Sequence, residues 1–193
     1  MKIGIDVGGT KCLGVAVDDD GKVVKQYRLP TPHADALCDT LVEIVAQLGE
    51  FNLIGIGVPG LISPEGVIRA SPNLVGAKEL ALRQMLEDRL GKKVLVENDA
   101  TCAALGEWSS GAAHGATDAW VITLGTGIGG GFISGSVLQR GAHGFAGEVG
   151  HMVVDPDGPL CPCGRNGCWE RYASGNGLSY LANGEKGEDV LSR

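Results

Sequence analysis

The chain has 193 residues, of which 44% are hydrophobic and 20% are charged, so it can bury a core as one large domain or two small ones. Its net charge of -7 offers no basic field for a nucleic-acid backbone, so binding to nucleic acid is not expected. No apolar run reaches the length of a membrane span, and the amino terminus opens on an alternating strand pattern, so we expect a cytoplasmic protein without a membrane partner.

The first part of the chain predicts a meander followed by a helix and a buried strand. The three strands of the meander are expected over residues 2–7, 12–17 and 22–29. Apolar residues at helical spacing predict a helix over residues 34–48, and an apolar run predicts a strand over residues 53–58. That strand ends at Pro59-Gly60, so it leads into a loop.

The middle of the chain brings a carboxylate to a corner between a strand and a helix. A helix is expected over residues 78–90, then a strand over residues 93–96 and a third helix over residues 100–108. Asp99 lies at this corner, where it can serve as a catalytic carboxylate or simply as the N-cap of the third helix. Local sequence leaves both roles open.

The later part of the chain repeats the opening pattern. A strand over residues 120–124 turns through a glycine-rich segment into a strand over residues 132–134. Because this turn is similar to the one at residues 5–10, we expect two related α/β lobes, residues 1–112 and 113–193, with a ligand cleft between them.

Both glycine-rich turns are candidate phosphate sites. Glycines let the backbone approach phosphate oxygens and point its N–H groups at them, and Asp6 is placed to hold a hydrated magnesium ion. An ordinary hairpin explains the first turn equally well, whereas the second has more glycines than a buried strand pair would favour. The candidate residues are Asp6, Gly8, Gly9, Thr10, Lys11, Gly125, Thr126, Gly127 and Gly129.

One imidazole and three thiolates crowd into a short segment. His151, Cys161, Cys163 and Cys168 form a Cys₃His set of the kind that closes a tetrahedral structural zinc site. Four protein ligands leave no open position, so we expect no catalysis by the zinc. The zinc either staples a loop only, or also positions His151 and Glu170 toward a substrate.

Three carboxylates are expected in polar corners of the fold instead of on solvated helix faces. Asp99, Glu148 and Glu170 are suited to accept hydrogen bonds from a neutral polyol such as a sugar. Transfer of a phosphoryl group to a hydroxyl needs one carboxylate within reach of its proton. Asp99 is the best candidate for that base.

Five segments taken together closely resemble the ROK family of sugar kinases and repressors. They are residues 5–11, 97–100, 124–131, 147–151 and 161–170. The last segment looks like the zinc signature of the family. Its Cys-x-Cys-Gly-x-x-Gly-Cys-Trp-Glu form is most similar to the bacterial, especially actinobacterial-type, glucokinases.

The resemblance implies an actin-like (ribonuclease H-like) ATPase fold and a homodimer that transfers the γ-phosphoryl group of Mg·ATP to the 6-hydroxyl of glucose. Asp99 would take the hydroxyl proton, and the zinc would be structural. The residues that would hold the sugar are Gly60, Asn73, Asn98, Asp99, Glu148, His151 and Glu170.

Two departures from the family pattern, and two alternatives, remain. Thr101-Cys102 stands where the family has Asn-Ala-Ala, and the chain stops at Arg193 where members continue through the adenosine pocket. We therefore expect an incomplete second lobe and weak activity of this chain alone. The alternatives are a kinase for mannose, fructose or an N-acetylhexosamine, and a non-catalytic sugar-sensing module.

Overall fold

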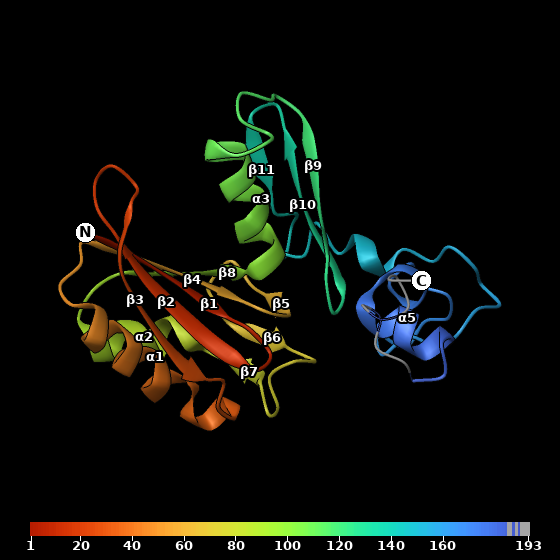
Figure 1. Cartoon of the computed structure of the whole chain (residues 1–193), viewed down its shortest axis with the longest axis horizontal. Helices are drawn as coiled ribbons and strands as arrows, with labels where there is room; N and C mark the ends of the chain where they lie inside the picture. Colours follow the sequence, from red (N-terminus) through yellow and green to blue (C-terminus); the bar gives the residue numbers. More distant parts are fainter. Residues whose placement is uncertain (185–186, 188, 190–193) are drawn as a thin grey trace. The chain divides into compact units, whose positions relative to one another are not determined.

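The computed structural model describes residues 1–184, 187 and 189, and its contacts divide the chain into two compact units (Figure 1). Unit 1 comprises Met1–Cys102 and Ala142–Phe145, and unit 2 comprises Ala103–Gly141 and Ala146–Arg193. Of the predicted second lobe, residues 185, 186, 188 and 190–193 lie outside the described residues.

Unit 1 is built on a five-stranded mixed sheet with the order β3-β2-β1-β4-β8. The strands are β1 (Lys2–Val7), β2 (Lys11–Val17), β3 (Val23–Pro30), β4 (Leu53–Val58) and β8 (Val94–Asn98). The expected meander is present, because β2 pairs antiparallel with both β1 and β3. β4 runs parallel to β1 and to β8, which requires crossover connections between these strands.

Two helices supply the crossovers, α1 (Ala34–Leu48) before β4 and α2 (Leu82–Leu90) before β8, and both cover one face of the sheet (Figure 1). Leu37, Leu41 and Ile44 of α1 are fully buried at helical spacing. The helix lies so close to β2 that a Cβ on Gly14 would stand 2.3 Å from Ile44 Cγ2. Only glycine therefore fits at this contact.

A small antiparallel sheet lies between β4 and α2 in the chain and was not predicted. It contains β5 (Leu61–Ile62), β6 (Ile68–Ala70) and β7 (Lys78–Leu80), in that order. The prediction of a helix over residues 78–90 is therefore wrong in its first turn, because Lys78 and Leu80 pair with β6. Glu79 has φ 51°, outside the helical range, and the helix begins at Leu82.

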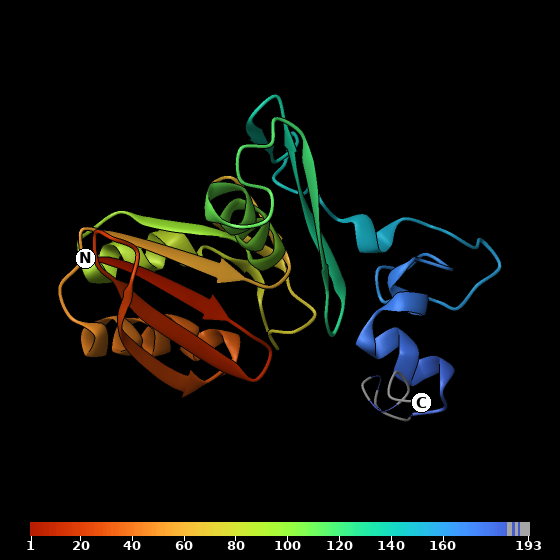
Figure 2. The same cartoon turned by 45° about the horizontal axis from the view of Figure 1, so that its top comes forward.

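Unit 2 contains a three-stranded antiparallel sheet with the order β11-β10-β9, seen from a second side in Figure 2. Its strands are β9 (Ala119–Leu124), β10 (Ile128–Ser134) and β11 (Val137–Gln139). Ala104 from α3 (Asp99–Ser110) packs with Ile133 and Leu138 in its core. The segments that follow are η1 (Val149–His151), α4 (Glu170–Ala173) and α5 (Gly175–Leu181).

The division between the units falls within α3. Near its start, a Cβ on Gly57 would lie 3.5 Å from Asp99 Cα and 3.5 Å from Cys102 Sγ, so the first turn packs on β4. Further along, Ala104 packs on the other sheet. The sequence places the boundary near residue 112, after this helix, whereas the contacts divide the units between Cys102 and Ala103. Local sequence does not show that one helix contributes to two cores.

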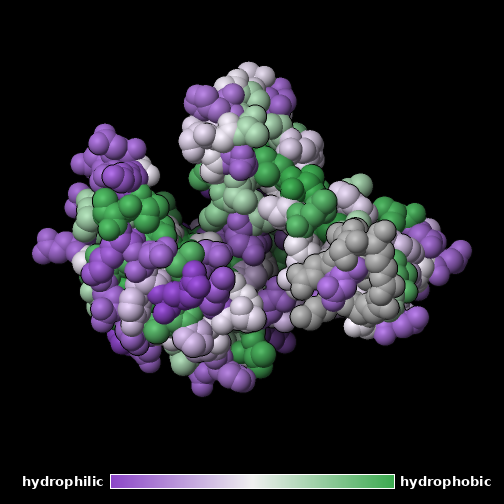
Figure 3. Space-filling model, viewed as in Figure 1, coloured by the Kyte–Doolittle hydropathy of each residue, from purple (hydrophilic) through white to green (hydrophobic). Residues whose placement is uncertain are grey.

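Unit 2 carries exposed apolar surface over β9 and β10, which is green in Figure 3. Trp120, Ile122 and Leu124 of β9 point to the same side of their strand and remain exposed. Trp120 stacks on Phe132 with ring centroids 4.5 Å apart. Among the described residues, no helix has the length and the apolar composition needed to cross a bilayer.

Candidate functional site

Most of the predicted unit 1 residues gather at one edge of the sheet. β1, β4 and β8 are parallel, so their carboxyl ends lie at the same edge. This edge is the usual place for ligands in open α/β sheets. Asp6 is on β1 near this end, Gly60 follows β4, and Asn98 with Asp99 stands where β8 meets α3.

The first glycine-rich turn connects β1 to β2 and is held in a defined shape. The N–H of Gly8 donates to the carbonyl of Lys11 at 2.9 Å. Thr31 at the end of β3 donates its hydroxyl to the Gly8 carbonyl at 2.6 Å. A Cβ on Gly9 would lie 3.8 Å from Asn73 Cβ, so the loop that carries Asn73 adjoins this turn.

The structure distinguishes Asp99 from its neighbour Asn98. The N–H of Thr101 donates to Asn98 Oδ1 at 2.9 Å, which is the bond that an N-cap residue makes. Asn98 Nδ2 also donates to the Gly60 carbonyl at 3.1 Å. The Asp99 carboxylate accepts one bond, from the N–H of Ala100, and is exposed. Asp99 is therefore not needed as the cap, and one of its oxygens can serve a ligand.

The surroundings of Asp6 disfavour its charged form. Although its carboxylate reaches solvent, loss of hydration raises the pKa of Asp6 above its ordinary value of 3.8, and the charge of Asp99 raises it further. Lys11 opposes this with a smaller effect. Two carboxylates held close together and only partly compensated by Lys11 destabilise the fold at neutral pH, which is typical of a functional site.

We expect Asp6→Asn to raise the melting temperature at pH 7. A carboxyl group with a raised pKa stabilises the fold when protonated, and this contribution is lost as the pH rises through its folded pKa. The difference in melting temperature between variant and parent should therefore shrink as the pH falls toward 3.8.

Asp20→Asn removes the same charge from an exposed loop and is the control for net charge. Calorimetric melting from pH 3.5 to pH 7 in metal-free buffer makes the comparison, with roughly 1 kcal/mol as the upper scale. Equal melting curves for Asp6→Asn and Asp20→Asn would contradict the expectation.

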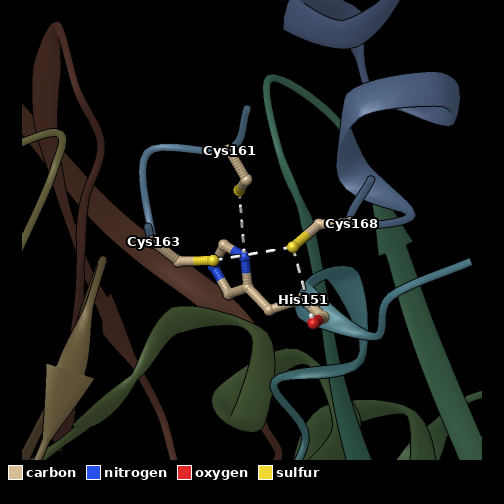
Figure 4. A group of neighbouring side chains, drawn as sticks. All are labelled: His151, Cys161, Cys163 and Cys168. Carbon is tan, nitrogen blue, oxygen red and sulfur yellow. Dashed lines mark hydrogen bonds between the residues drawn. The ribbon is translucent and has the colours of Figure 1, made fainter. Parts of the chain in front are cut away.

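In unit 2 the predicted metal ligands come together (Figure 4). The ligand atoms of His151, Cys161, Cys163 and Cys168 all lie within 4.8 Å of one another. Cys161 Sγ is 3.5 Å from His151 Nδ1, and Cys163 Sγ is 3.5 Å from Cys168 Sγ. Zinc bonds of about 2.0–2.3 Å at tetrahedral angles separate ligand atoms by roughly 3.3–3.8 Å. The four side chains therefore fit a zinc ion.

The charge state of the cluster also suits a cation. Burial, and after it hydrogen bonds with Cys163 and Cys161, together raise the pKa of Cys168 to about 12. For Cys163, burial acts in the same direction, but hydrogen bonds from Arg165 and the neighbouring thiols outweigh it and lower the pKa to about 6. The cluster thus holds a thiolate at neutral pH, and a zinc ion would supply the charge that deprotonates the others.

The remaining unit 2 candidates adjoin the cluster. His151 directs Nδ1 at Cys161, and its Nε2 lies 3.9 Å from Glu148 Oε2. One ring nitrogen therefore faces the ligand set while the other faces a carboxylate, which is the division of roles that metal-bound histidines show. Glu170 begins α4, two residues after Cys168, and is partly buried.

The second glycine-rich turn connects β9 to β10, and its glycines have more than one use. A Cβ on Gly125 would meet open space, so this position leaves room for a ligand. A Cβ on Gly130 would lie 3.0 Å from Val149 Cγ2, and one on Gly150 would lie 2.2 Å from the Ile128 carbonyl. The interpretation that ligand approach explains the glycine run is thus too broad, because part of the run serves packing against η1.

Two supporting residues were not predicted from the sequence. Thr31 ties the end of β3 to the first turn, and no local pattern around it indicates this. Arg165 bonds to the Cys163 thiolate, and this bond raises the pKa of the Arg165 guanidinium. Its position between the second and third cysteines was the available signal, since a cation there favours thiolates.

A family model described as the ROK family matches residues 2–191. A glucokinase from Streptomyces coelicolor is 42% identical over 187 residues, which cover 94% of this chain and 59% of the relative. An N-acetylmannosamine kinase from Citrobacter koseri is 39% identical, over 94% of this chain and 64% of its own length. The chain thus spans about three fifths of these relatives.

A solved structure shows the same fold. The crystal structure of a ROK family glucokinase from Streptomyces griseus, in complex with glucose and AMPPNP, matches with a TM-score of 0.86 and 36% identity. The match covers 99% of this chain and 70% of that chain.

Proposed function

The chain belongs to the ROK family, and from this membership and its site we propose that it carries the sugar-phosphorylating machinery of a glucokinase, which transfers the γ-phosphoryl group of Mg·ATP to the 6-hydroxyl of glucose. The resemblance read from five sequence segments is thereby confirmed at the level of the family. The likeness to the glucokinase structure likewise confirms the expected α/β fold of the actin-like ATPase type.

The observation that carries the proposal is the state of Asp99. Asn98 caps α3 in its place, so Asp99 keeps an exposed carboxylate at the carboxyl edge of the parallel strands. We assign to Asp99 the role of general base. It accepts the proton of the 6-hydroxyl as that oxygen forms its bond to the γ-phosphorus, while the bond from phosphorus to the β,γ-bridging oxygen breaks and ADP leaves. The proton then passes to solvent.

The other unit 1 residues have binding roles in the proposal. The first turn is assigned to the phosphates, where charge accumulates during transfer. The Gly8 N–H is bonded to the Lys11 carbonyl, so the donors would be the other N–H groups of the turn and the Lys11 side chain. Asp6 is the candidate ligand for a hydrated magnesium ion, because the neighbouring charge of Asp99 makes a cation favourable there. Gly60, Asn73 and Asn98 are assigned to the sugar.

The unit 2 residues contribute hydrogen-bonding groups. Glu148, His151 and Glu170 are assigned to sugar hydroxyls, and Gly125, Thr126, Gly127 and Gly129 to phosphate. A zinc ion held by His151 and the three cysteines would have four protein ligands, so its contribution is to hold the loop and orient His151. A homodimer remains a proposal from the resemblance.

A panel of hexoses tests which sugar is the substrate. We expect the zinc-loaded chain to bind glucose roughly tenfold or more tighter than N-acetylmannosamine in isothermal titration, with mannose and fructose as further competitors. Preference for N-acetylmannosamine would instead favour the activity named for the N-acetylmannosamine kinase from Citrobacter koseri. Tight glucose binding without phosphoryl transfer would favour a sugar-sensing module.

A further inference from the structure

The second glycine-rich turn is bonded to the chain that follows the zinc cluster. The N–H of Ile128, where β10 begins, donates to Glu170 Oε2 at 2.9 Å. The N–H of Gly175 donates to the Gly125 carbonyl at 2.8 Å, and the N–H of Asn176 donates to the Thr126 carbonyl at 3.1 Å. One side chain and two backbone groups from the region of α4 and α5 therefore hold Gly125, Thr126 and Ile128.

The first turn is held differently. Its internal bond from Gly8 to Lys11 is supported by Thr31, which belongs to the loop directly after β3 of the same sheet. The second turn also has an internal bond, from the N–H of Gly125 to the Gly127 carbonyl at 3.0 Å. Unlike the first turn, it is held in addition by residues 42 to 50 positions away in sequence, and the contact from Glu170 comes from a charged group. Hydrogen bonds to charged groups are roughly twice as strong as neutral ones.

Glu170 is itself fixed by the zinc loop. It lies two residues after Cys168, whose backbone forms an isolated bridge with Val153. The N–H of Trp169 donates to the Met152 carbonyl at 2.8 Å, directly after His151 in the chain. Two ligands of the zinc cluster thus flank the backbone that sets the position of the Glu170 carboxylate.

Gly127 shows how closely the carboxylate fits the turn. A Cβ at Gly127 would lie 2.5 Å from Glu170 Oε2, so any larger residue there would displace the carboxylate. A Cβ at neighbouring Gly125 would meet nothing within 4 Å. The requirement for glycine at position 127 therefore comes from Glu170.

We propose that Glu170 is a positioning residue that transmits the geometry of the zinc cluster to the second phosphate turn. One carboxylate oxygen holds the Ile128 N–H, and the other is left to accept a sugar hydroxyl. The contact with a sugar hydroxyl rests on the proposed function. The zinc cluster, the sugar contact and the phosphate turn of unit 2 are then joined through one side chain, so occupation by sugar also stabilises the turn.

Hydrogen exchange of the Ile128 amide in the zinc-loaded chain tests the proposal without requiring turnover. We expect Glu170→Ala to increase its exchange rate roughly tenfold or more, because a hydrogen bond to a charged group is lost. Glu170→Gln keeps an acceptor oxygen and should restore protection to within about threefold of the parent, although it weakens glucose binding. Asp157→Ala removes an exposed carboxylate from the same loop and should leave the amide unchanged.

Two further arms separate this role from general damage. Gly127→Ala should accelerate Ile128 exchange even though Glu170 is intact, and so replaces Glu170→Ala if that variant loses protection throughout β9–β11. Removal of zinc with a chelator should accelerate the same amide. Unchanged Ile128 exchange in Glu170→Ala or Gly127→Ala, or equal exchange with and without zinc, would overturn the proposal. If the parent chain fails to bind glucose, the proposed function fails, whereas the exchange result still decides whether Glu170 positions the turn.

Discussion

Asp99→Asn is expected to lower kcat for glucose phosphorylation about 10²- to 10⁴-fold, the usual contribution of a general base. The amide keeps an oxygen that can accept from the Ala100 N–H, as Asp99 Oδ1 does at 2.9 Å, so the start of α3 should stay folded. It cannot take a proton from the sugar hydroxyl. Steady-state kinetics with Mg·ATP should show the loss in kcat, and titration should show a glucose Kd changed by much less.

Glu107→Gln is the matched control for this substitution. Glu107 lies on the same helix and is exposed, and its carboxylate accepts from the N–H of Ala112, just after the helix ends. The same chemical change there should leave kcat unaltered. Equal activity of Asp99→Asn and the parent would remove Asp99 from the mechanism.

Loss of a zinc ligand should have the second large effect. Cys161 is buried, and its thiolate would be one of the four ligands, so Cys161→Ser is expected to lose most of its zinc. Structural zinc sites contribute apparent binding free energies of about 10–16 kcal/mol in small domains. The segment from η1 to α4 contains few regular elements and depends on the cluster, so unit 2 should lose a large part of its free energy of unfolding.

Cys38→Ala separates zinc binding from the general loss of a thiol. Cys38 is a buried residue of α1 in unit 1 and does not belong to the ligand set. Atomic absorption should find one zinc per chain in this variant and in the parent, and circular dichroism melting should show destabilisation only in Cys161→Ser. A full zinc content in Cys161→Ser would refute the assigned ligand set.

Local patterns explain which parts of this account were predictable. α1 follows from apolar residues at helical spacing, and the metal cluster follows from three cysteines that lie within eight residues of one another and a histidine shortly before them. Asp99 was recognised because a strand and a helix meet there. In each case the interactions that decide the structure are between residues close in sequence.

Other parts depend on contacts between distant residues and were missed. Ile128 bonds to Glu170 across 42 positions, and no property of either segment alone indicates it. Lys78 and Leu80 join β6 in place of α2, because pairing with another strand outweighs a helical pattern. A Cβ on Gly130 would lie 3.0 Å from Val149 Cγ2, so part of the glycine run that was interpreted as a ligand contact serves packing against η1.

Phosphorus NMR of the reaction products tests the central claim most directly. Because only weak activity is expected of this chain alone, the zinc-loaded chain at high concentration with glucose and Mg·ATP should yield glucose 6-phosphate and ADP slowly and in equal amounts. Asp99→Asn should yield far less of both. A chain that binds glucose yet forms no phosphorylated sugar, or one that phosphorylates a different hydroxyl, would contradict the account.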